Sequence, residues 1–148
     1  MTTIYAYEKH TTPHTIVSML LPSSPSPGDC CTELCALDGI TYVSVPDGLT
    51  LPAQPSEIKA TKPTLTPEIK ERIKASSPHV ALIYERTEAI IRQKYTASDE
   101  AKFARIGVGA ALGAYTFGDG EQDELLAFGA HCEAARQWGR DQRAALGL

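Results

Sequence analysis

The sequence predicts an α+β fold: a small antiparallel β module at the N-terminus, a proline-rich linker and a C-terminal helical hairpin or bundle of three to four helices. Proline usage supports this division, because all ten prolines lie between Pro13 and Pro78 and leave the rest of the chain free to be helical. Apolar residues also alternate near the N-terminus and recur at helical spacing later. The predicted modules are residues 1–51 (β), 52–65 (linker) and 66–148 (helices).

Short alternating runs predict the strands. Residues 3–7 and 41–45 combine β-branched and aromatic side chains, which favour strands. Residues 15–21 form another candidate strand, joined to the first by a wide polar loop, and residues 49–51 form a candidate edge strand. Loops or turns are predicted where Pro, Gly, Asp and Ser gather, at residues 23–29, 37–39 and 46–48.

Two pairs of a hydroxyl residue and a proline predict where the first helices begin. Thr66 and Ser77 can each cap a helix, and Pro67 and Pro78 already have the φ angle of a first helical residue. The second helix is predicted over residues 78–95, because its apolar side chains recur three and four positions apart.

Polar start signals predict two further helices. Residues 96–100 begin the third, which we expect to break after Ile106, because the glycines that follow each cost roughly 1 kcal/mol relative to alanine. Residues 119–122 resemble a capping box and begin the fourth. We expect the second and fourth helices to pack antiparallel through their apolar stripes. The predicted helical core is Val80, Ile83, Ile90, Ile91, Leu125, Phe128 and Cys132.

Charge and hydropathy exclude several classes of partner. The net charge of −4 argues against nucleic-acid binding, which needs a clustered positive surface. No stretch reaches the roughly 20 apolar residues of a membrane-spanning helix. The first residues lack the basic-then-apolar pattern of a secretory signal, so we expect a cytosolic protein with no membrane partner.

Cysteine and histidine spacing raises the question of a metal site. Cys30, Cys31 and Cys35 form a cluster, and three residues separate His10 from His14. Zinc sites usually draw four ligands from two well-spaced pairs, and neither group has that spacing. Reduced thiols, some of them buried, are the favoured interpretation, and a Cys/His metal-binding module is the alternative.

Two other patterns resemble catalytic motifs only superficially. His131 and Cys132 are adjacent in a predicted helix, so their side chains point about 100° apart and cannot act as a base and its nucleophile. Gly107, Gly109 and Gly113 lack the lysine that ends a phosphate-binding loop, and close helix packing explains them better. We therefore expect neither enzymatic activity nor a cofactor.

Aromatic and β-branched side chains are the candidate contacts to a protein partner. Tryptophan anchors interfaces because it buries a large area at little entropic cost, although packing within the chain is the first interpretation of the single tryptophan. The helical part has few large side chains, which is compatible with a homo-oligomer. The candidate partner-binding residues are Tyr5, Tyr7, Tyr42, Val43 and Trp138.

Three stretches of the sequence carry a resemblance to a known group of proteins. They are residues 40–52, the segment 77–83 with Arg92-Gln93-Lys94-Tyr95 and Asp99-Glu100, and the ending at residues 135–148. Together they resemble small proteins encoded beside tail-fibre genes in tailed bacteriophages and prophages. The likeness spans residues 40–106 and 130–148, whereas the first 35 residues and the glycine-rich stretch 107–120 fall outside it.

The resemblance implies a tail-fibre assembly chaperone that binds a tail-fibre or receptor-binding protein in the cytoplasm of the host bacterium. Unassembled β-rich fibres fold slowly and expose strand edges and apolar surface, which a small partner could cover. The alternative implied by the same resemblance is a structural tail or baseplate component that is retained in the virion. The group supplies no catalytic residue for this sequence.

Overall fold

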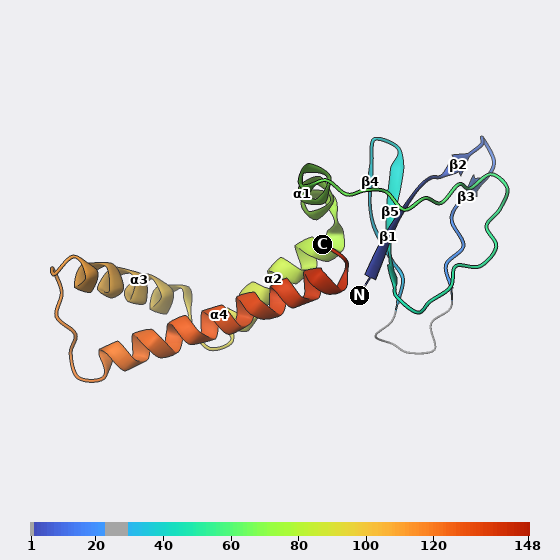
Figure 1. The fold of residues 1–148 in the computed structure, drawn as a ribbon. Helices are drawn as coiled ribbons and strands as arrows, with labels where there is room; N and C mark the ends of the chain where they lie inside the picture. Colours follow the sequence, from blue (N-terminus) through green and yellow to red (C-terminus); the bar gives the residue numbers. More distant parts are fainter. Residues whose placement is uncertain (1, 23–29) are drawn as a thin grey trace. The chain divides into compact units, whose positions relative to one another are not determined.

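The protein is seen in a computed structural model that describes residues 2–22 and 30–148 (Figure 1). The chain divides into two compact units, one formed by Met1–Leu82 with Gln142–Leu148 and the other by Ile83–Asp141. Short antiparallel strands in the N-terminal part and four helices in the C-terminal part confirm the predicted α+β class. The loop predicted at residues 23–29 lies outside the described residues.

Three antiparallel strands form the main sheet of the first unit. The central strand is β5 (Ile40–Pro46), which pairs with β1 (Thr2–Glu8) on one side and β4 (Thr32–Leu37) on the other. The strands predicted at residues 3–7 and 41–45 are confirmed as β1 and β5. β4 was not predicted, because its six residues contain one β-branched side chain and no aromatic one.

Both predicted turns around β5 are confirmed. Asp38 and Gly39 join β4 to β5 with φ angles of 52° and 83°. Two positive φ angles are typical of the type I′ turn, whose twist matches that of the flanking strands. At the other end Gly48 has a φ of 95°, and the Leu49 N–H donates to the Pro46 carbonyl at 3.3 Å.

Both faces of the main sheet are covered, so β5 is buried on both sides from residue 41 to residue 45. Alternate side chains of the strands point to opposite faces. One face packs against a helix and C-terminal residues, and the other packs against loops. The buried residues of the first face are Ile4, Ala6, Leu34, Cys35, Tyr42 and Ile73, and those of the second are Tyr7, Met19, Val43, Val45 and Ile58.

Two predictions about short strands were wrong. The candidate strand at residues 15–21 is reduced to β3 (Ile16–Val17), which pairs with β2 (His10–Thr11). A tight hairpin, closed by the Thr12 N–H donating to the Thr15 carbonyl at 2.8 Å, replaces the expected wide loop. Residues 49–51 form no strand, because Leu49 and Leu51 instead pack their side chains against the second face of the sheet.

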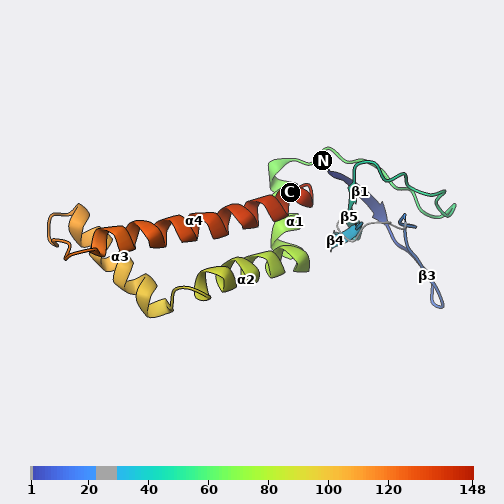
Figure 2. The ribbon, with the colours of Figure 1, turned by 90° about the horizontal axis from the view of Figure 1, so that it is seen from below.

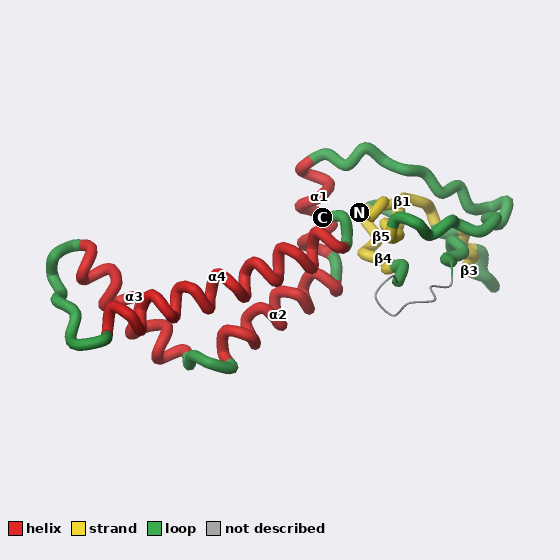
Figure 3. Tube along the Cα trace, turned by 60° about the horizontal axis from the view of Figure 1, so that its bottom comes forward, coloured by secondary structure: helices red, strands yellow, loops and turns green. Residues whose placement is uncertain are grey.

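The segment 52–65, predicted as a linker, lies against the first unit's own sheet (Figure 3). Ala6 and Thr61 exchange two backbone hydrogen bonds of 2.9 Å each. Ile58 is buried in the second cluster. This segment therefore contributes to the core of the unit, although it contains no helix and no regular strand.

Local capping explains where the first two helices begin and end. In α1 (Pro67–Ser76) the Thr66 hydroxyl accepts the Ile69 N–H, which confirms the predicted cap. The predicted cap of α2 (Pro78–Arg92) was wrong in its detail: the Ser77 hydroxyl is buried and has no hydrogen-bond partner among the described residues. α2 also ends three residues earlier than predicted.

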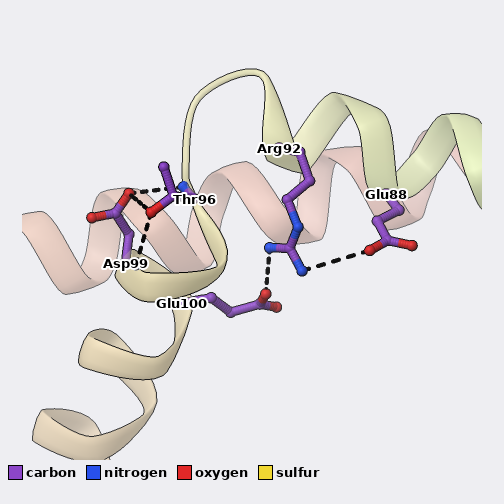
Figure 4. A network of polar contacts seen from close by, with 5 residues as sticks. All are labelled: Glu88, Arg92, Thr96, Asp99 and Glu100. Atoms are coloured by element: carbon purple, nitrogen blue, oxygen red, sulfur yellow. Dashed lines mark hydrogen bonds and ion pairs between the residues drawn. The ribbon is translucent and has the colours of Figure 1, made fainter.

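The third helix does not break at its glycines. α3 (Ala97–Ala111) begins with a capping box, in which Thr96 and Asp99 each accept the other's backbone N–H (Figure 4). It continues past Ile106, contrary to the prediction, and Gly109 within it is a site of close packing. A methyl group on Gly109 would lie 2.9 Å from the Tyr115 Cβ atom, so only glycine fits there without a shift.

α4 (Glu121–Ala145) begins where residues 119–122 predicted, and in the second unit it lies beside α2 and α3 and runs antiparallel to both (Figures 1 and 2). Four rings meet where α2 gives way to α3, at centroid separations of 4.9 to 5.9 Å. They belong to Tyr95, Phe103, Phe128 and His131. Edge-to-face and stacked rings of this kind hold the three helices together.

The C-terminus ends in a glycine turn on β1. Gly147 has a φ of 84°, and the Leu148 N–H donates to the Arg143 carbonyl at 3.0 Å, as in a Schellman motif. A methyl group on Gly147 would lie 3.2 Å from Ile4 Cγ1. The Thr2 hydroxyl donates to the Ala145 carbonyl at 2.8 Å. The last residues are therefore fitted to the first strand.

Candidate protein-binding surface

The candidate partner-binding residues differ in how much of each side chain the fold leaves accessible. Tyr7, Tyr42 and Val43 are buried in the two sheet clusters, so they stabilise the fold and present no surface to a partner. Tyr5 and Trp138 are half-buried. These two alone among the five keep part of their side chains exposed.

The predicted helical-core residues fall into two groups. Val80, Ile83 and Cys132 are buried. Burial raises the pKa of the Cys132 thiol, in keeping with a position on the apolar stripe. The remaining four, which are Ile90, Ile91, Leu125 and Phe128, are half-buried.

The cysteines of the N-terminal cluster have three different environments. Cys30 is exposed, Cys31 is half-buried and Cys35 is buried in β4. Burial raises the pKa of the Cys31 and Cys35 thiols. Among residues 2–22 and 30–148, no three His, Cys, Asp or Glu side chains are grouped as metal ligands would be.

The His131 side chain forms a hydrogen bond with the backbone of α2. Its Nε2 atom lies 3.0 Å from the Ile90 carbonyl oxygen. A carbonyl can only accept, so Nε2 carries the proton and donates it to this bond. The imidazole is thus a structural donor between α4 and α2.

The sequence did not predict the exposed apolar side chains that lie on either side of the connection between α3 and α4. Four large apolar side chains between residues 108 and 126 are exposed to solvent. Val108 and Leu112 stand one turn apart on α3, so they share a face. The exposed fractions are 60% for Val108, 78% for Leu112, 38% for Tyr115 and 63% for Leu126. We call these four residues the apolar tip.

The backbone beneath the apolar tip is held in a defined conformation. Gly113 has a φ of 69° and ends α3 in a Schellman motif, in which the Ala114 N–H donates to the Gly109 carbonyl at 2.8 Å. Tyr115 then packs against Gly109. The glycines of this stretch therefore shape the backbone of the tip.

The Glu121 side chain joins the loop between α3 and α4 to the start of α4. Its Oε2 atom accepts the Tyr115 hydroxyl at 2.7 Å and the Gly118 N–H at 2.8 Å. Both hydrogen bonds lower the pKa of the Glu121 carboxyl, and the bond from the Gly118 N–H has the larger effect. The hydrogen bond to Glu121 also raises the pKa of the Tyr115 phenol.

The sequence contained one signal for these exposed side chains. Val108 and Leu112 are four residues apart, but Gly107, Gly109 and Gly113 surround them and suggested a broken helix. Once α3 is continuous, the same spacing gives an exposed apolar stripe. What the sequence could not reveal is which face of α3 is left uncovered.

Comparison with known proteins adds no relative. No protein-family model, no curated protein and no solved structure matches this chain. Within the described residues, no helix is both long and apolar enough to span a bilayer.

Proposed function

We propose that this protein is a non-enzymatic tail-fibre assembly chaperone, which binds a tail-fibre or receptor-binding protein in the bacterial cytoplasm until that protein assembles. Two things support the proposal. One is the resemblance of residues 40–106 and 130–148 to proteins encoded beside tail-fibre genes. The other is the apolar tip, which is the observation that carries the proposal.

The tip is suited to shielding another polypeptide. Large apolar side chains that a small protein leaves exposed are candidate contacts to a partner. Burying a leucine completely contributes about 1.5–3 kcal/mol, so covering Leu112 and Leu126 supplies several kcal/mol toward binding. An unassembled fibre exposes the apolar surface that would complement them.

Co-expression with a tail-fibre protein tests this function. We expect the soluble yield of fibre to rise when the protein is present, and to stay low with an empty vector. An equal yield in both cultures would refute the proposal. Mass spectrometry of purified virions adds a second arm, since a chaperone leaves the particle, whereas stoichiometric retention would indicate a tail or baseplate component instead.

A further inference from the structure

We propose that a hollow on the first face of the main sheet binds a free α-amino acid with an apolar side chain, in its zwitterionic form. The hollow belongs to the first unit, whereas the apolar tip belongs to the second. The inference therefore goes beyond the proposed function and does not depend on it. It rests on how the hollow forms, on its apolar floor and on two opposite charges that line it.

The hollow forms where residues 57–63 separate from β1. Ala6 and Thr61 pair through two backbone hydrogen bonds, and this contact is an isolated bridge. If the antiparallel pairing continued, Glu8 and Lys59 would form the next hydrogen-bonded pair, but no backbone hydrogen bond joins them. All four residues line the hollow, whose volume is about 440 Å³. Small-molecule sites have volumes of about 300–1,000 Å³.

The floor of the hollow is apolar. Ala6 on β1 stands opposite Tyr42 on β5, and Ile40 lies two residues before Tyr42, so the three side chains are on the same face of the sheet. All three line the hollow, and Tyr42 is only 7% exposed, so the fold already holds it in place. A ligand with a large apolar side chain covers this floor and is stabilised by the hydrophobic effect.

Two opposite charges that line the hollow have no partner. Glu8 and Lys59 are both exposed, and neither forms an ion pair within the part of the chain that the structure describes. Glu57 is the third charged residue of the lining, and its carboxylate already accepts the Ser56 hydroxyl at 2.9 Å. One carboxylate and one ammonium group are therefore available to a ligand.

This charge pattern selects a zwitterion. The ammonium group of an α-amino acid can donate to the Glu8 carboxylate while its carboxylate accepts from the Lys59 ammonium group, and hydrogen bonds between charged groups are stronger than neutral ones. A compound with a single charge satisfies one of the two residues and is repelled by the other. A segment inside a polypeptide has neither terminal charge, so it lacks this complementarity as well.

Nuclear magnetic resonance titration of the isotope-labelled whole chain with four ligands tests the inference. L-phenylalanine has both charges and an apolar body, its N-acetyl derivative lacks the ammonium group, its amide lacks the carboxylate, and glycine lacks the apolar side chain. Slightly acidic buffer keeps the ammonium group of the amide protonated. We expect phenylalanine to shift the amides of Glu8, Ile40 and Lys59 and to bind at least about tenfold more tightly than each of the other three.

Two results of this titration would overturn the inference. Equal affinities for phenylalanine and its two derivatives would show that the contact is merely apolar. The absence of shifts at the three amides would show that the hollow does not bind the amino acid.

Matched variants assign the two charges. Lys59→Gln should abolish the preference for phenylalanine over its amide, and Glu8→Gln should abolish the preference over the N-acetyl derivative. Lys62→Gln and Glu85→Gln remove the same charges elsewhere, since Lys62 lies over the Tyr5 ring and Glu85 is on α2, and should leave both preferences unchanged. Control variants that lose these preferences as well would show non-specific attraction and overturn the inference.

The outcomes also separate this inference from the proposed function. Far-ultraviolet circular dichroism verifies that each variant is folded, and the comparison of ligands on the wild type decides the question without any substitution. The titration does not involve the fibre protein. Failure of amino acid binding would therefore refute this inference alone and leave the chaperone function standing.

Discussion

The Nε2 atom of His131, on α4, donates a hydrogen bond of 3.0 Å to the carbonyl oxygen of Ile90, in the last turn of α2. If the helix continued, the Lys94 N–H would donate to the Ile90 carbonyl, but it donates to the Ile91 carbonyl instead. The last carbonyls of a helix need partners from outside it. An imidazole from the antiparallel helix therefore caps α2.

Removing this donor should destabilise the second unit. In His131→Phe the aromatic contact with Tyr95 is kept while the hydrogen bond is lost, so we expect a loss of about 1 kcal/mol in the free energy of unfolding. Urea unfolding followed by circular dichroism measures it. His79→Phe, at an exposed histidine of α2, is the control and should be nearly neutral; a similar loss in both variants would contradict the capping role.

Two glycines of the C-terminal helix region should respond to alanine in opposite directions. Gly147→Ala should destabilise the protein by roughly 1–2 kcal/mol, because its φ of 84° is unfavourable for alanine and Ile4 lies against it. Gly129→Ala should stabilise it by roughly 0.5–1 kcal/mol, because α4 is open there and alanine favours helix. Thermal unfolding of both variants checks the signs, and a stabilising Gly147→Ala would refute the C-terminal turn.

The two hydrogen bonds that Glu121 accepts from Tyr115 and Gly118 should respond to pH in both acid and alkali. These bonds lower the pKa of the Glu121 carboxyl from 4.5. Their contribution to stability is therefore full above that value and is lost as the pH falls through the lowered pKa. They raise the pKa of Tyr115 from 10.0, so that contribution is full below 10.0 and is lost as the pH rises through the raised pKa.

Nuclear magnetic resonance can follow these hydrogen bonds through the chemical shift of the Gly118 amide. We expect its chemical shift to be constant at neutral pH and to change in acid as Glu121 is protonated. The acid change should disappear in Glu121→Gln, and the alkaline change should disappear in Tyr115→Phe. A wild-type profile that persists in Glu121→Gln would show that another group causes it.

The four thiols should react in the order of their exposure. With an aromatic disulfide reagent at mildly alkaline pH, we expect Cys30 to react first and Cys31 more slowly, since burial raises its pKa. Cys35 and Cys132 should react only after unfolding, because both are buried. Cys30→Ser should remove the fast phase alone, and rapid labelling of Cys132 in the folded protein would contradict its place in the core.

The sequence predicted best those features that depend on neighbouring residues. Three such features, each determined within four residues, form in the structure. They are the helix cap at Thr66 before Pro67, the cap at Thr96 with Asp99 three residues later, and the turn at Asp38 and Gly39. Pairing between distant segments was harder to predict. β4 becomes a strand because β5 lies beside it, and Ile58 is buried because residues 52–65 return to β1.

The candidate site was the least predictable feature. Tyr7 and Tyr42 have the composition of binding residues, but a sheet covered on both faces buries them. Conversely, Leu112 and Leu126 have the composition of core residues, and the fold leaves them exposed. Exposure depends on which neighbours cover a side chain, and that is a property of tertiary packing that no local pattern contains.

The most direct test of the account is the yield of soluble fibre protein when it is co-expressed with the wild type or with the Leu112→Ser/Leu126→Ser variant. Both leucines are exposed, so the variant should fold and accumulate like the wild type. We expect the wild type to keep the fibre soluble and to co-purify with it, and the variant to lose both effects. Full solubilisation of the fibre by the folded variant would contradict binding through the tip.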